Sequence, residues 1–299
     1  MRVLVSGGAG FLGSHLVDSL IARGDEVVVL DDLSRGDKSQ INTSARFVHG
    51  DVRLFQDWQN ACHDFEPEVI HHLAAVNGTR RFHKEADLVV DVNINGTRMA
   101  LKCARDQGAK MVFYSSPEAF GEQESMSLTN QSNSIFTPAD LHQRHSYGAS
   151  KHIGELLCQF EFRNGLEVVI VRPYNAYGPR LRSGENGQVV SMMMNSNPII
   201  VHGDGSQTRS LTWVGDIVEA LLTITGQGGL SGKAFNLGSI EEVSMLDLAK
   251  RVASLRGVEY EFGEPNKGDS KRRIPDVSMN HEIQWFASTT LDEGLTQLL

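Results

Sequence analysis

Residues 1–32 carry the sequence pattern that most constrains the fold of this chain. A short apolar strand is predicted over residues 2–6, and the segment Gly7-Gly8-Ala9-Gly10-Phe11-Leu12-Gly13 follows it at once. Apolar residues then recur at helical spacing as far as Gly24, and a second apolar strand over residues 27–30 ends at Asp31. This order predicts a βαβ unit with a tight turn between the first strand and the helix.

A turn of this composition suits the pyrophosphate group of a dinucleotide. Gly7, Gly10 and Gly13 allow backbone N–H groups to approach the phosphates closely, and the helix N-terminus directs its positive dipole end at them. Asp31 follows Gly13 by 18 residues, at a strand tip where its carboxylate can accept hydrogen bonds from both adenosine ribose hydroxyls. The same carboxylate would repel a 2′-phosphate, so the sequence predicts NAD rather than NADP as the cofactor. Arg35 weakens this preference without reversing it.

The composition argues against several other classes of protein. The 299 residues carry a formal net charge of -9, and the one basic run is Lys271-Arg272-Arg273, so no nucleic-acid partner is expected. Three scattered cysteines without CxxC spacing indicate neither a disulfide framework nor a zinc site, and no metal is expected. The sequence shows no signal peptide and no apolar run of membrane-spanning length, so we expect a cytoplasmic protein without a membrane partner.

Predicted strands alternate with predicted helices as far as Pro173. After the βαβ unit, a strand and turn are expected at 45–52, further strands at 68–75, 110–116 and 168–173, and helices at 58–65, 87–108 and 147–164. This alternation predicts an α/β fold with a doubly wound parallel sheet of the Rossmann type, in a cofactor domain over residues 1–175. We expect a smaller α/β substrate lobe over 176–299, with segments near 210–240 packing back on the first domain. Residues 121–146 are polar and predict a loop of the length usual for lids or substrate contacts.

Two other strand ends are candidates for cofactor contacts. Asp51 and Val52 end the third predicted strand, where a short acid can reach the adenine amine, although the spacing equally allows an Asx turn. The fourth strand ends in Leu73-Ala74-Ala75, and small residues at such a place let a flat ligand pass close to the backbone. Both positions fit a dinucleotide that lies across the carboxyl ends of the strands.

Tyr147 and Lys151 form a candidate acid–base pair. They stand at positions i and i+4 of a predicted helix, so both side chains lie on one face. An ammonium group beside a phenol is expected to lower the pKa of Tyr147 toward neutrality, so that Tyr147 can take a proton from a substrate hydroxyl. Ser116, at the end of the fifth predicted strand, can hydrogen-bond the same substrate oxygen. The alternative for the pair is a surface contact on a helix.

Together with other segments, these pieces make the chain resemble the extended short-chain dehydrogenase/reductase family, in particular its nucleotide-sugar epimerases and dehydratases. The matching segments are residues 7–13, Asp31-Asp32-Leu33-Ser34, Gly50-Asp51-Val52, His72-Leu73-Ala74-Ala75, Asn93-Ile94-Asn95-Gly96-Thr97, Ser115-Ser116, Tyr147 with Lys151, residues 172–179, residues 203–209, and Gly268-Asp269 before Arg272-Arg273. The resemblance covers nearly all of the chain. It implies bound NAD, oxidation of a nucleotide diphosphate sugar at C4, chemistry made possible by the 4-keto group, and return of the hydride. It also implies a homodimer formed through the helices expected at 87–108 and 147–164.

The resemblance further implies roles for individual residues. Ser116 matches the catalytic serine or threonine, Tyr147 the base, and Lys151 its partner and a ligand of the nicotinamide ribose. The other implied cofactor contacts are Gly7, Gly10, Phe11, Leu12, Gly13, Asp31, Asp32, Leu33, Ser34, Asp51, Val52, Leu73, Ala74, Ala75 and Asn93, of which Asn93 could equally be a helix-packing residue.

Five residues are expected to contact the substrate. Asn175, Arg209 and Arg273 fall where the family binds the nucleotide diphosphate, and arginine forks suit phosphate oxygens. Thr79 and Arg80 belong to the segment 76–82, which departs from common members of the family and lies where the sugar should sit.

Glu118 occupies the position that separates the chemistries within this family. Simple 4-epimerases do not usually have a carboxylate there, whereas 4,6-dehydratases and uronic-acid decarboxylases do, so Glu118 is the expected base for the C5 proton. Pro117 stands where the best-known dehydratases carry an acid, which weakens the dehydratase interpretation. The alternatives are a 4-epimerase and a decarboxylase of a nucleotide-linked uronic acid that would use Arg80 or Arg81. The alternative for Glu118 itself is a solvent-facing glutamate at a strand end. From another class, the alternative is a non-catalytic dinucleotide sensor, against which the presence of Ser116, Tyr147 and Lys151 argues.

Overall fold

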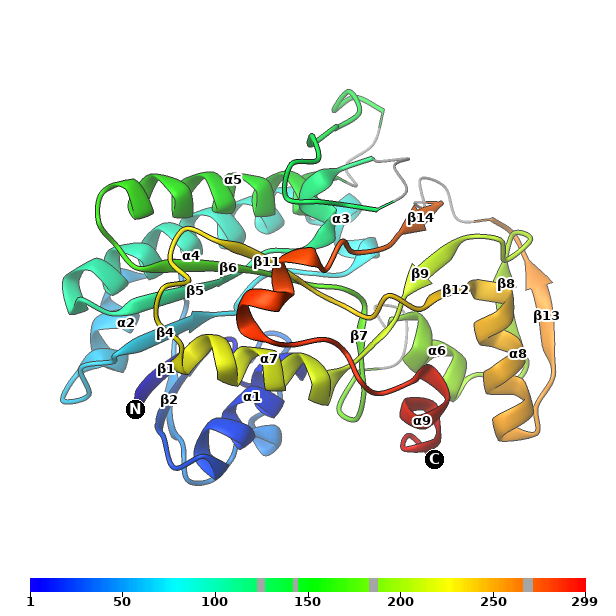
Figure 1. Cartoon of the computed structure of the whole chain (residues 1–299), viewed down its shortest axis with the longest axis horizontal. Helices are drawn as coiled ribbons and strands as arrows, with labels where there is room; N and C mark the ends of the chain where they lie inside the picture. Colours follow the sequence, from blue (N-terminus) through cyan, green and yellow to red (C-terminus); the bar gives the residue numbers. More distant parts are fainter. Residues whose placement is uncertain (123–126, 142–144, 183–187, 266–270) are drawn as a thin grey trace.

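A seven-stranded parallel sheet forms the centre of the molecule (Figure 1). In this computed structural model, which describes residues 1–122, 127–141, 145–182, 188–265 and 271–299, the strand order is β11-β6-β5-β4-β1-β2-β3, and neighbouring strands run parallel. The strands are β1 (Arg2–Ser6), β2 (Glu26–Asp31), β3 (Arg46–His49), β4 (Val69–His72), β5 (Lys110–Tyr114), β6 (Val168–Pro173) and β11 (Ala234–Leu237). The α/β fold with a doubly wound parallel sheet, predicted from the sequence, is confirmed.

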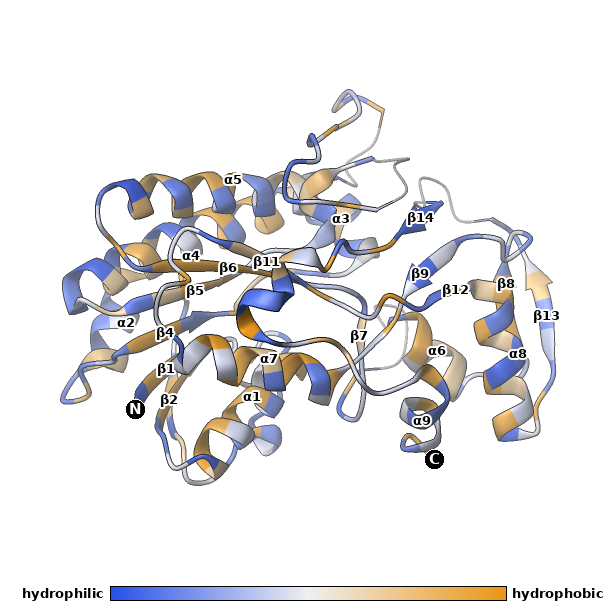
Figure 2. Ribbon diagram, viewed as in Figure 1, coloured by the Kyte–Doolittle hydropathy of each residue, from blue (hydrophilic) through white to orange (hydrophobic). Residues whose placement is uncertain are grey.

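Helices cover both faces of this sheet. On one face α1 (Phe11–Ala22) packs beside α7 (Val214–Gly226), and on the other lie α2 (Phe55–Cys62), α4 (Ala86–Gln107) and α5 (His145–Arg163). Successive residues of β1 enter different cores, because Val3 and Val5 pack with α1 and α7 while Leu4 packs with the helices of the other face. Figure 2 shows the resulting apolar strands between helices with polar outer faces. Burial on both faces explains why these strands are continuous apolar runs.

A smaller lobe is built mainly from residues after Pro173. Its elements are α6 (Val189–Asn195), β8 (Ile199–His202), β9 (Thr208–Ser210), β12 (Glu242–Ser244), α8 (Met245–Arg256), β13 (Tyr260–Gly263), β14 (Arg272–Arg273) and α9 (Leu291–Thr296). Strands β12, β9 and β14 form one small sheet, β13 pairs with β8, and β7 (Ala176–Tyr177) pairs with β10 (Thr212–Trp213). The chain returns to the central sheet with α7 and β11, and η3 (Ser278–Ile283) packs against β11. The division of the chain into domains at residue 175 stays a prediction.

Short elements follow the carboxyl ends of the strands. They are η1 (Lys38–Gln40) after β2, α3 (Thr79–Lys84) after β4, and η2 (Pro117–Phe120) after β5. Helix α3 was not predicted from the sequence. In the loop expected at 121–146, backbone bonds join Glu122 to Ile135 and Ile135 to Phe120. Residues 123–126 and 142–144 of this loop lie outside the described residues, as do Gly268 and Asp269. None of the described helices is long and apolar enough to cross a membrane.

Candidate active site

The glycine-rich turn after β1 is packed so closely that side chains would not fit at Gly7 and Gly13. The φ angle of Gly7 is +78°, and a Cβ atom there would lie 2.6 Å from the backbone nitrogen of Ala74. A Cβ atom at Gly13 would lie 2.2 Å from the carbonyl oxygen of Gly7. Both positions therefore require glycine. The turn forms a cradle at the N-terminus of α1, whose first turn carries no acidic residue, and such a place suits a phosphate group.

Asp31 adjoins the same cradle from the end of β2. Its buried carboxylate accepts hydrogen bonds from the backbone N–H groups of Ala9 (3.0 Å) and Leu33 (2.9 Å). Burial raises the pKa of Asp31 above its ordinary value, and the two backbone donors oppose this rise. An ionised carboxylate can accept about four hydrogen bonds, so Asp31 keeps capacity for ribose hydroxyls. The neighbouring carboxylate of Asp32 accepts from the backbone and the hydroxyl of Ser34.

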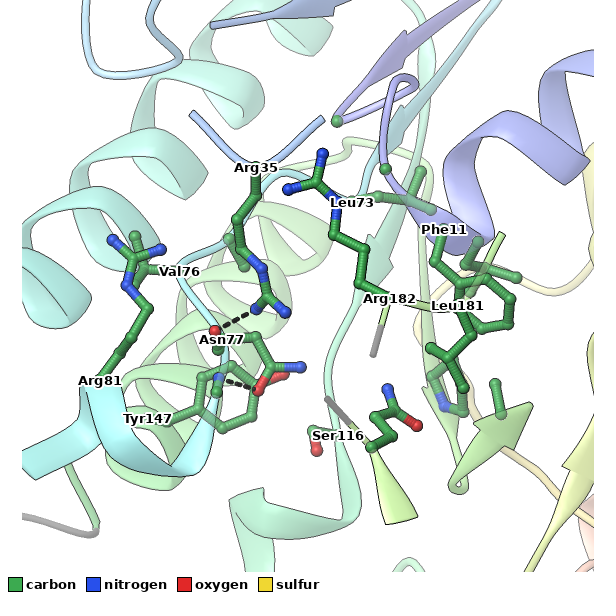
Figure 3. A pocket seen from close by; sticks show the side chains of 18 of the residues that line it. Phe11, Arg35, Leu73, Val76, Asn77, Arg81, Ser116, Tyr147, Leu181 and Arg182 are labelled. Carbon is green, nitrogen blue, oxygen red and sulfur yellow. Dashed lines mark hydrogen bonds between the residues drawn. The ribbon is translucent and has the colours of Figure 1, made fainter. Parts of the chain in front are cut away.

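One large cavity, with a volume of about 1010 Å³, extends from the glycine turn to the smaller lobe. Among the predicted cofactor residues, its lining contains Gly7, Gly10, Phe11, Leu12, Gly13, Asp31, Asp32, Ser34, Val52, Leu73, Ala74 and Ala75. Among the predicted catalytic and substrate residues, it contains Ser116, Glu118, Tyr147, Lys151, Arg80, Asn175 and Arg209. Figure 3 shows Phe11, Leu73, Ser116 and Tyr147 around this space. The fold thus brings segments that are far apart in the sequence to one site.

Leu33, Asp51 and Asn93 do not line this cavity. The Asp51 carboxylate accepts hydrogen bonds from the backbone and the guanidinium of Arg53, which is the Asx-type arrangement that the spacing left open, and Arg53 holds the pKa of Asp51 below its usual value. Asn93 accepts from the backbone N–H of Val76 (2.8 Å) and donates to the hydroxyl of Ser150 (3.0 Å), so it fastens the turn after β4 to α4 and α5. Direct contacts of these residues with a cofactor stay predictions.

Ser116, Tyr147 and Lys151 meet on one wall of the cavity. Ser116 lies close enough to Tyr147 to oppose the rise in the pKa of its phenol. The Lys151 ammonium donates to the carbonyl oxygen of Tyr114 (2.7 Å) and lies 5.7 Å from the centre of the Tyr147 ring. Phe82 of α3 stacks on the Tyr147 ring, with the ring centroids 4.9 Å apart. No sequence pattern indicated this aromatic contact.

The predicted lowering of the Tyr147 pKa toward neutrality is wrong for this structure. Burial is the largest effect and raises the pKa of the phenol above its ordinary value, while Ser116 and Arg35 oppose the rise. Burial also lowers the pKa of Lys151 to about 8. The reason for the difference is that the ammonium is directed at the Tyr114 carbonyl oxygen, not at the phenol.

Glu118 lies in η2, directly after the strand end that carries Ser116. The Ser116 hydroxyl accepts a hydrogen bond from the backbone N–H of Glu118 (3.2 Å) and so caps this short helix. The Glu118 carboxylate pairs with the buried guanidinium of Arg273 (3.1 Å), which also donates to the carbonyl oxygens of Pro117 (2.8 Å) and Gly121 (3.0 Å). Arg273 does not line the cavity, because it is bonded to acceptors in and next to η2, and its predicted contact with the diphosphate stays a prediction.

The other predicted substrate residues stand on two sides of the cavity. Asn175 and Arg209 line it from the smaller lobe, and the Asn175 amide donates to the carbonyl oxygen of Ser210 (2.9 Å). Arg80 lines it from α3, the helix that Thr79 begins. Because Asn175, Arg209 and Arg80 line the cavity, a ligand that fills it can contact them, and these contacts stay predictions.

Arg35 and Arg182 are among the arginines outside the predicted set that also line the cavity. Arg35 follows β2 and donates to the carbonyl oxygen of Asn77, in the turn after β4. Arg182 donates to the carbonyl oxygen of Gly36 (3.4 Å). Figure 3 shows the Arg35 guanidinium directed toward Asn77 and the neighbouring Tyr147 ring. The sequence places Arg35 close to Asp31, but its side chain is directed to another wall of the cavity.

Known proteins are similar to this chain along nearly its full length. The model of the NAD dependent epimerase/dehydratase family matches residues 3–238. UDP-glucuronic acid decarboxylase 1 of Arabidopsis thaliana is 32% identical over 315 residues, covering 100% of this chain and 69% of that protein. A putative UDP-glucose 4-epimerase of Methanocaldococcus jannaschii is 32% identical over 308 residues, covering 99% of this chain and 97% of that protein. The structure of UDP-glucose 4-epimerase from Thermotoga maritima with UDP-glucose has a TM-score of 0.92 at 29% identity, covering 99% and 97% of the two chains.

Proposed function

The chain belongs to the NAD-dependent epimerase/dehydratase family, and we propose that it converts a nucleotide diphosphate sugar through a transient 4-keto intermediate. The observation that carries this proposal is the presence of Ser116, Tyr147 and Lys151 in one cavity with the glycine turn and Asp31. A dinucleotide sensor would need the turn and Asp31 but no acid–base groups. The cavity of about 1010 Å³ also stands at the upper end of ordinary ligand pockets, which are about 300–1,000 Å³, as suits a site for two nucleotides.

The groups around C4 of the sugar have separate roles. Tyr147 takes the proton of the 4-hydroxyl, and Ser116 hydrogen-bonds the same oxygen. When bound, NAD supplies the hydride acceptor for C4. Lys151, with a pKa of about 8, is mostly protonated at neutral pH and holds a positive charge on this wall. Because burial raises the pKa of Tyr147, nearby cations such as Arg35 are needed to bring the phenolate within reach.

Glu118 extends the chemistry to C5. A ketone at C4 acidifies the C5–H bond, and a carboxylate within reach can remove that proton. Glu118 lines the same cavity as Ser116, and the ion pair with Arg273 fixes the orientation of its carboxylate. Loss of the 6-hydroxyl as water from the enolate gives dehydration, for which another group must donate the proton because Pro117 has none to give. Return of the proton to the opposite face of C5 gives epimerisation.

A second candidate is decarboxylation of a nucleotide-linked uronic acid. Oxidation at C4 makes the C6 carboxylate β to a ketone, so the C5–C6 bond breaks, carbon dioxide leaves, the bonding electrons form an enolate, and a proton then adds to C5. The observation that favours this candidate is the presence of arginines around the site. Arg80 and Arg81 line the cavity, and Arg273 contacts Glu118. Arginine forks fit carboxylates. One relative described above is itself named a UDP-glucuronic acid decarboxylase.

Product mass distinguishes these reactions. The purified protein is incubated, with and without added NAD, with a panel of UDP-, dTDP-, GDP- and CDP-linked sugars that includes uronic acids. Loss of water indicates a dehydratase, loss of carbon dioxide a decarboxylase, and a new isomer of unchanged mass an epimerase. If no sugar is converted even with NAD added, the enzymatic proposal is overturned.

We also propose that the chain forms a homodimer through α4 and α5. Ile153, Leu156 and Phe160 are exposed on α5 at a spacing that puts them on one face, and Val90 is exposed on α4, which packs beside α5. A second copy can cover this apolar surface with its own in an isologous interface. Light scattering is expected to give twice the chain mass of 32.9 kDa for the native protein and the single mass for Phe160→Asp. A monomeric native protein would contradict this proposal.

A further inference from the structure

The loop after β2 is fixed on the glycine turn. The backbone N–H of Asp37 donates to the carbonyl oxygen of Ala9 (3.0 Å), and a Cβ atom at Gly36 would lie 2.6 Å from the Cβ atom of Ala9. Arg182 reaches the same loop and donates to the carbonyl oxygen of Gly36. Arg35 therefore starts from a defined position beside the cradle of the glycine turn.

The side chain of Arg35 crosses from this loop to the turn after β4. Its guanidinium donates to the carbonyl oxygen of Asn77 (Figure 3), and the Asn77 side chain in turn accepts from the backbone N–H of Gly78 (2.7 Å), which stabilises this turn. The guanidinium also interacts electrostatically with the phenol of Tyr147. Arg35 thus joins the part of the cavity that suits phosphates to the part that holds the acid–base groups.

Several positive charges gather around this crossing. Arg81 and Arg182 line the cavity together with Arg35. Burial is the largest effect that lowers the pKa of Arg35, and repulsion from the positive charges of Arg81 and Arg182 lowers it further. Arg81 forms an ion pair with Glu85 (2.6 Å). The whole chain has a net charge of -9, so the accumulation of guanidinium groups is a local property of this wall. Partly buried like charges of this kind are stabilised when an anion binds among them.

We propose that Arg35, assisted by Arg182, closes over the pyrophosphate of bound NAD and retains the dinucleotide in the protein. The glycine turn supplies backbone donors for the phosphates, and Arg35 supplies the full positive charge that backbone donors lack. Hydrogen bonds from arginine to phosphate are charge-assisted and often bidentate. Because Arg35 is also bonded to Asn77, the dinucleotide can leave only when this side chain swings away, so the contact acts mainly on the rate of NAD release.

The nucleotide sugar of the proposed reaction also carries a diphosphate, so Arg35 could bind either this group or the pyrophosphate of NAD. Arg209 and Asn175 line the cavity from the smaller lobe, whereas the loop of Arg35 is bonded to Ala9 of the glycine turn. This attachment assigns Arg35 to the cofactor, and it makes NAD release and UDP binding independent measurements.

The test measures NAD itself, not turnover. Arg35→Gln and Arg35→Lys are compared with Arg98→Gln, which makes the same change of charge as Arg35→Gln at an exposed position of α4. Bound nucleotide is quantified after denaturation, and its release is followed after dilution into an excess of an NAD-consuming enzyme. We expect Arg35→Gln to release NAD about 10- to 100-fold faster than the native protein, from the usual strength of hydrogen bonds to charged groups. Arg35→Lys should be intermediate because it keeps the charge but not the fork, and Arg98→Gln should be unchanged.

Two outcomes would overturn the proposal. One is release of NAD from Arg35→Gln at the native rate. The other is a loss of UDP affinity in the NAD-saturated variant with native NAD release, which would assign Arg35 to the substrate. Circular dichroism checks the fold of each variant. If Arg35→Gln does not fold, the rates of NAD release from Arg35→Lys and Arg182→Gln are compared with the rate from the native protein instead. None of these measurements needs conversion of a sugar, so failure of the proposed reaction would not affect the result.

Discussion

Mild acid should destabilise this protein because two histidines of β4 are buried in neutral form. His71 and His72 are 0% and 1% exposed, and burial lowers the pKa of each from 6.5 to about 3. The Thr225 hydroxyl donates its proton to the carbonyl oxygen of Leu221 (2.6 Å), so its oxygen accepts a hydrogen bond from Nε2 of His71 (3.0 Å). The other ring nitrogen of His71, Nδ1, then carries no proton and accepts from the Tyr114 hydroxyl (2.9 Å). This network uses both ring nitrogens of the neutral imidazole, so a second ring proton would require the Tyr114 hydroxyl to stop donating to Nδ1.

The sign and size of the effect follow from proton linkage. Between about pH 3 and pH 6.5 the unfolded chain binds protons at these rings that the folded protein does not, so stability is fully present above pH 6.5 and falls as the pH is lowered. Each histidine is expected to lower the free energy of unfolding by about 2 kcal/mol at pH 5, and the two together by about 4 kcal/mol. The lowered pKa of His15 acts in the same direction, and the raised pKa of Asp31 acts against it.

Urea unfolding between pH 7.5 and pH 5 measures this dependence. Below pH 6 the slope should approach about 2.7 kcal/mol per pH unit for the two rings, and His71→Gln should remove about half of it. His63→Gln is the matched control, because the His63 side chain is 77% exposed. NMR of histidine-labelled protein tests the cause directly. A native His71 ring that titrates near pH 6.5, or a free energy of unfolding that does not change between pH 7 and pH 5, would refute the reasoning.

Three further predictions concern the site. Tyr147→Phe is expected to lower kcat about 10²–10⁴-fold while the purified protein keeps its NAD, and an active variant would remove Tyr147 from the proposed role. Glu118→Gln is expected to allow oxidation at C4, seen as NADH absorbance in a single turnover, and to block the following step at C5; product formed at the native rate would contradict this. Gly13→Ala brings a Cβ atom to 2.2 Å from the Gly7 carbonyl oxygen, so it is expected to abolish NAD binding and lower Tm. Gly226→Ala is the control and should change neither, because the atom nearest to its added Cβ is 3.9 Å away. NAD binding by Gly13→Ala would show that the turn is not the phosphate cradle.

The parts of the fold that could be predicted depend on short-range constraints. The glycine turn is one of them, because the atoms that exclude a side chain at Gly13 belong to Gly7, only a few residues earlier. The apolar strands are another, because β1, β2 and β6 are buried on both faces and show this in their composition. The family resemblance and NAD as the cofactor, both inferred from ordered motifs, are confirmed by the match over residues 3–238.

The parts that could not be predicted depend on where distant segments meet. The spacing of Tyr147 and Lys151 puts them on one helical face, but the ammonium is directed at the Tyr114 carbonyl oxygen, which only the position of β5 beside α5 determines. Arg273 pairs with a carboxylate 155 residues earlier in the chain, and no local pattern in β14 indicates this partner. The direction of Arg35 likewise depends on a distant segment, because its guanidinium donates to the carbonyl oxygen of Asn77, 42 residues later in the chain.

The return of the chain to the central sheet limits how this protein can diversify. α7 packs on α1, and β11 is the hydrogen-bonded neighbour of β6, although both follow the first elements of the smaller lobe. A fragment ending at residue 175 would lose both and expose an open, apolar strand edge, which favours aggregation. Neither lobe can therefore be exchanged as a cassette by recombination at one point. We therefore expect new ligand specificities to arise by substitutions of residues that line the cavity.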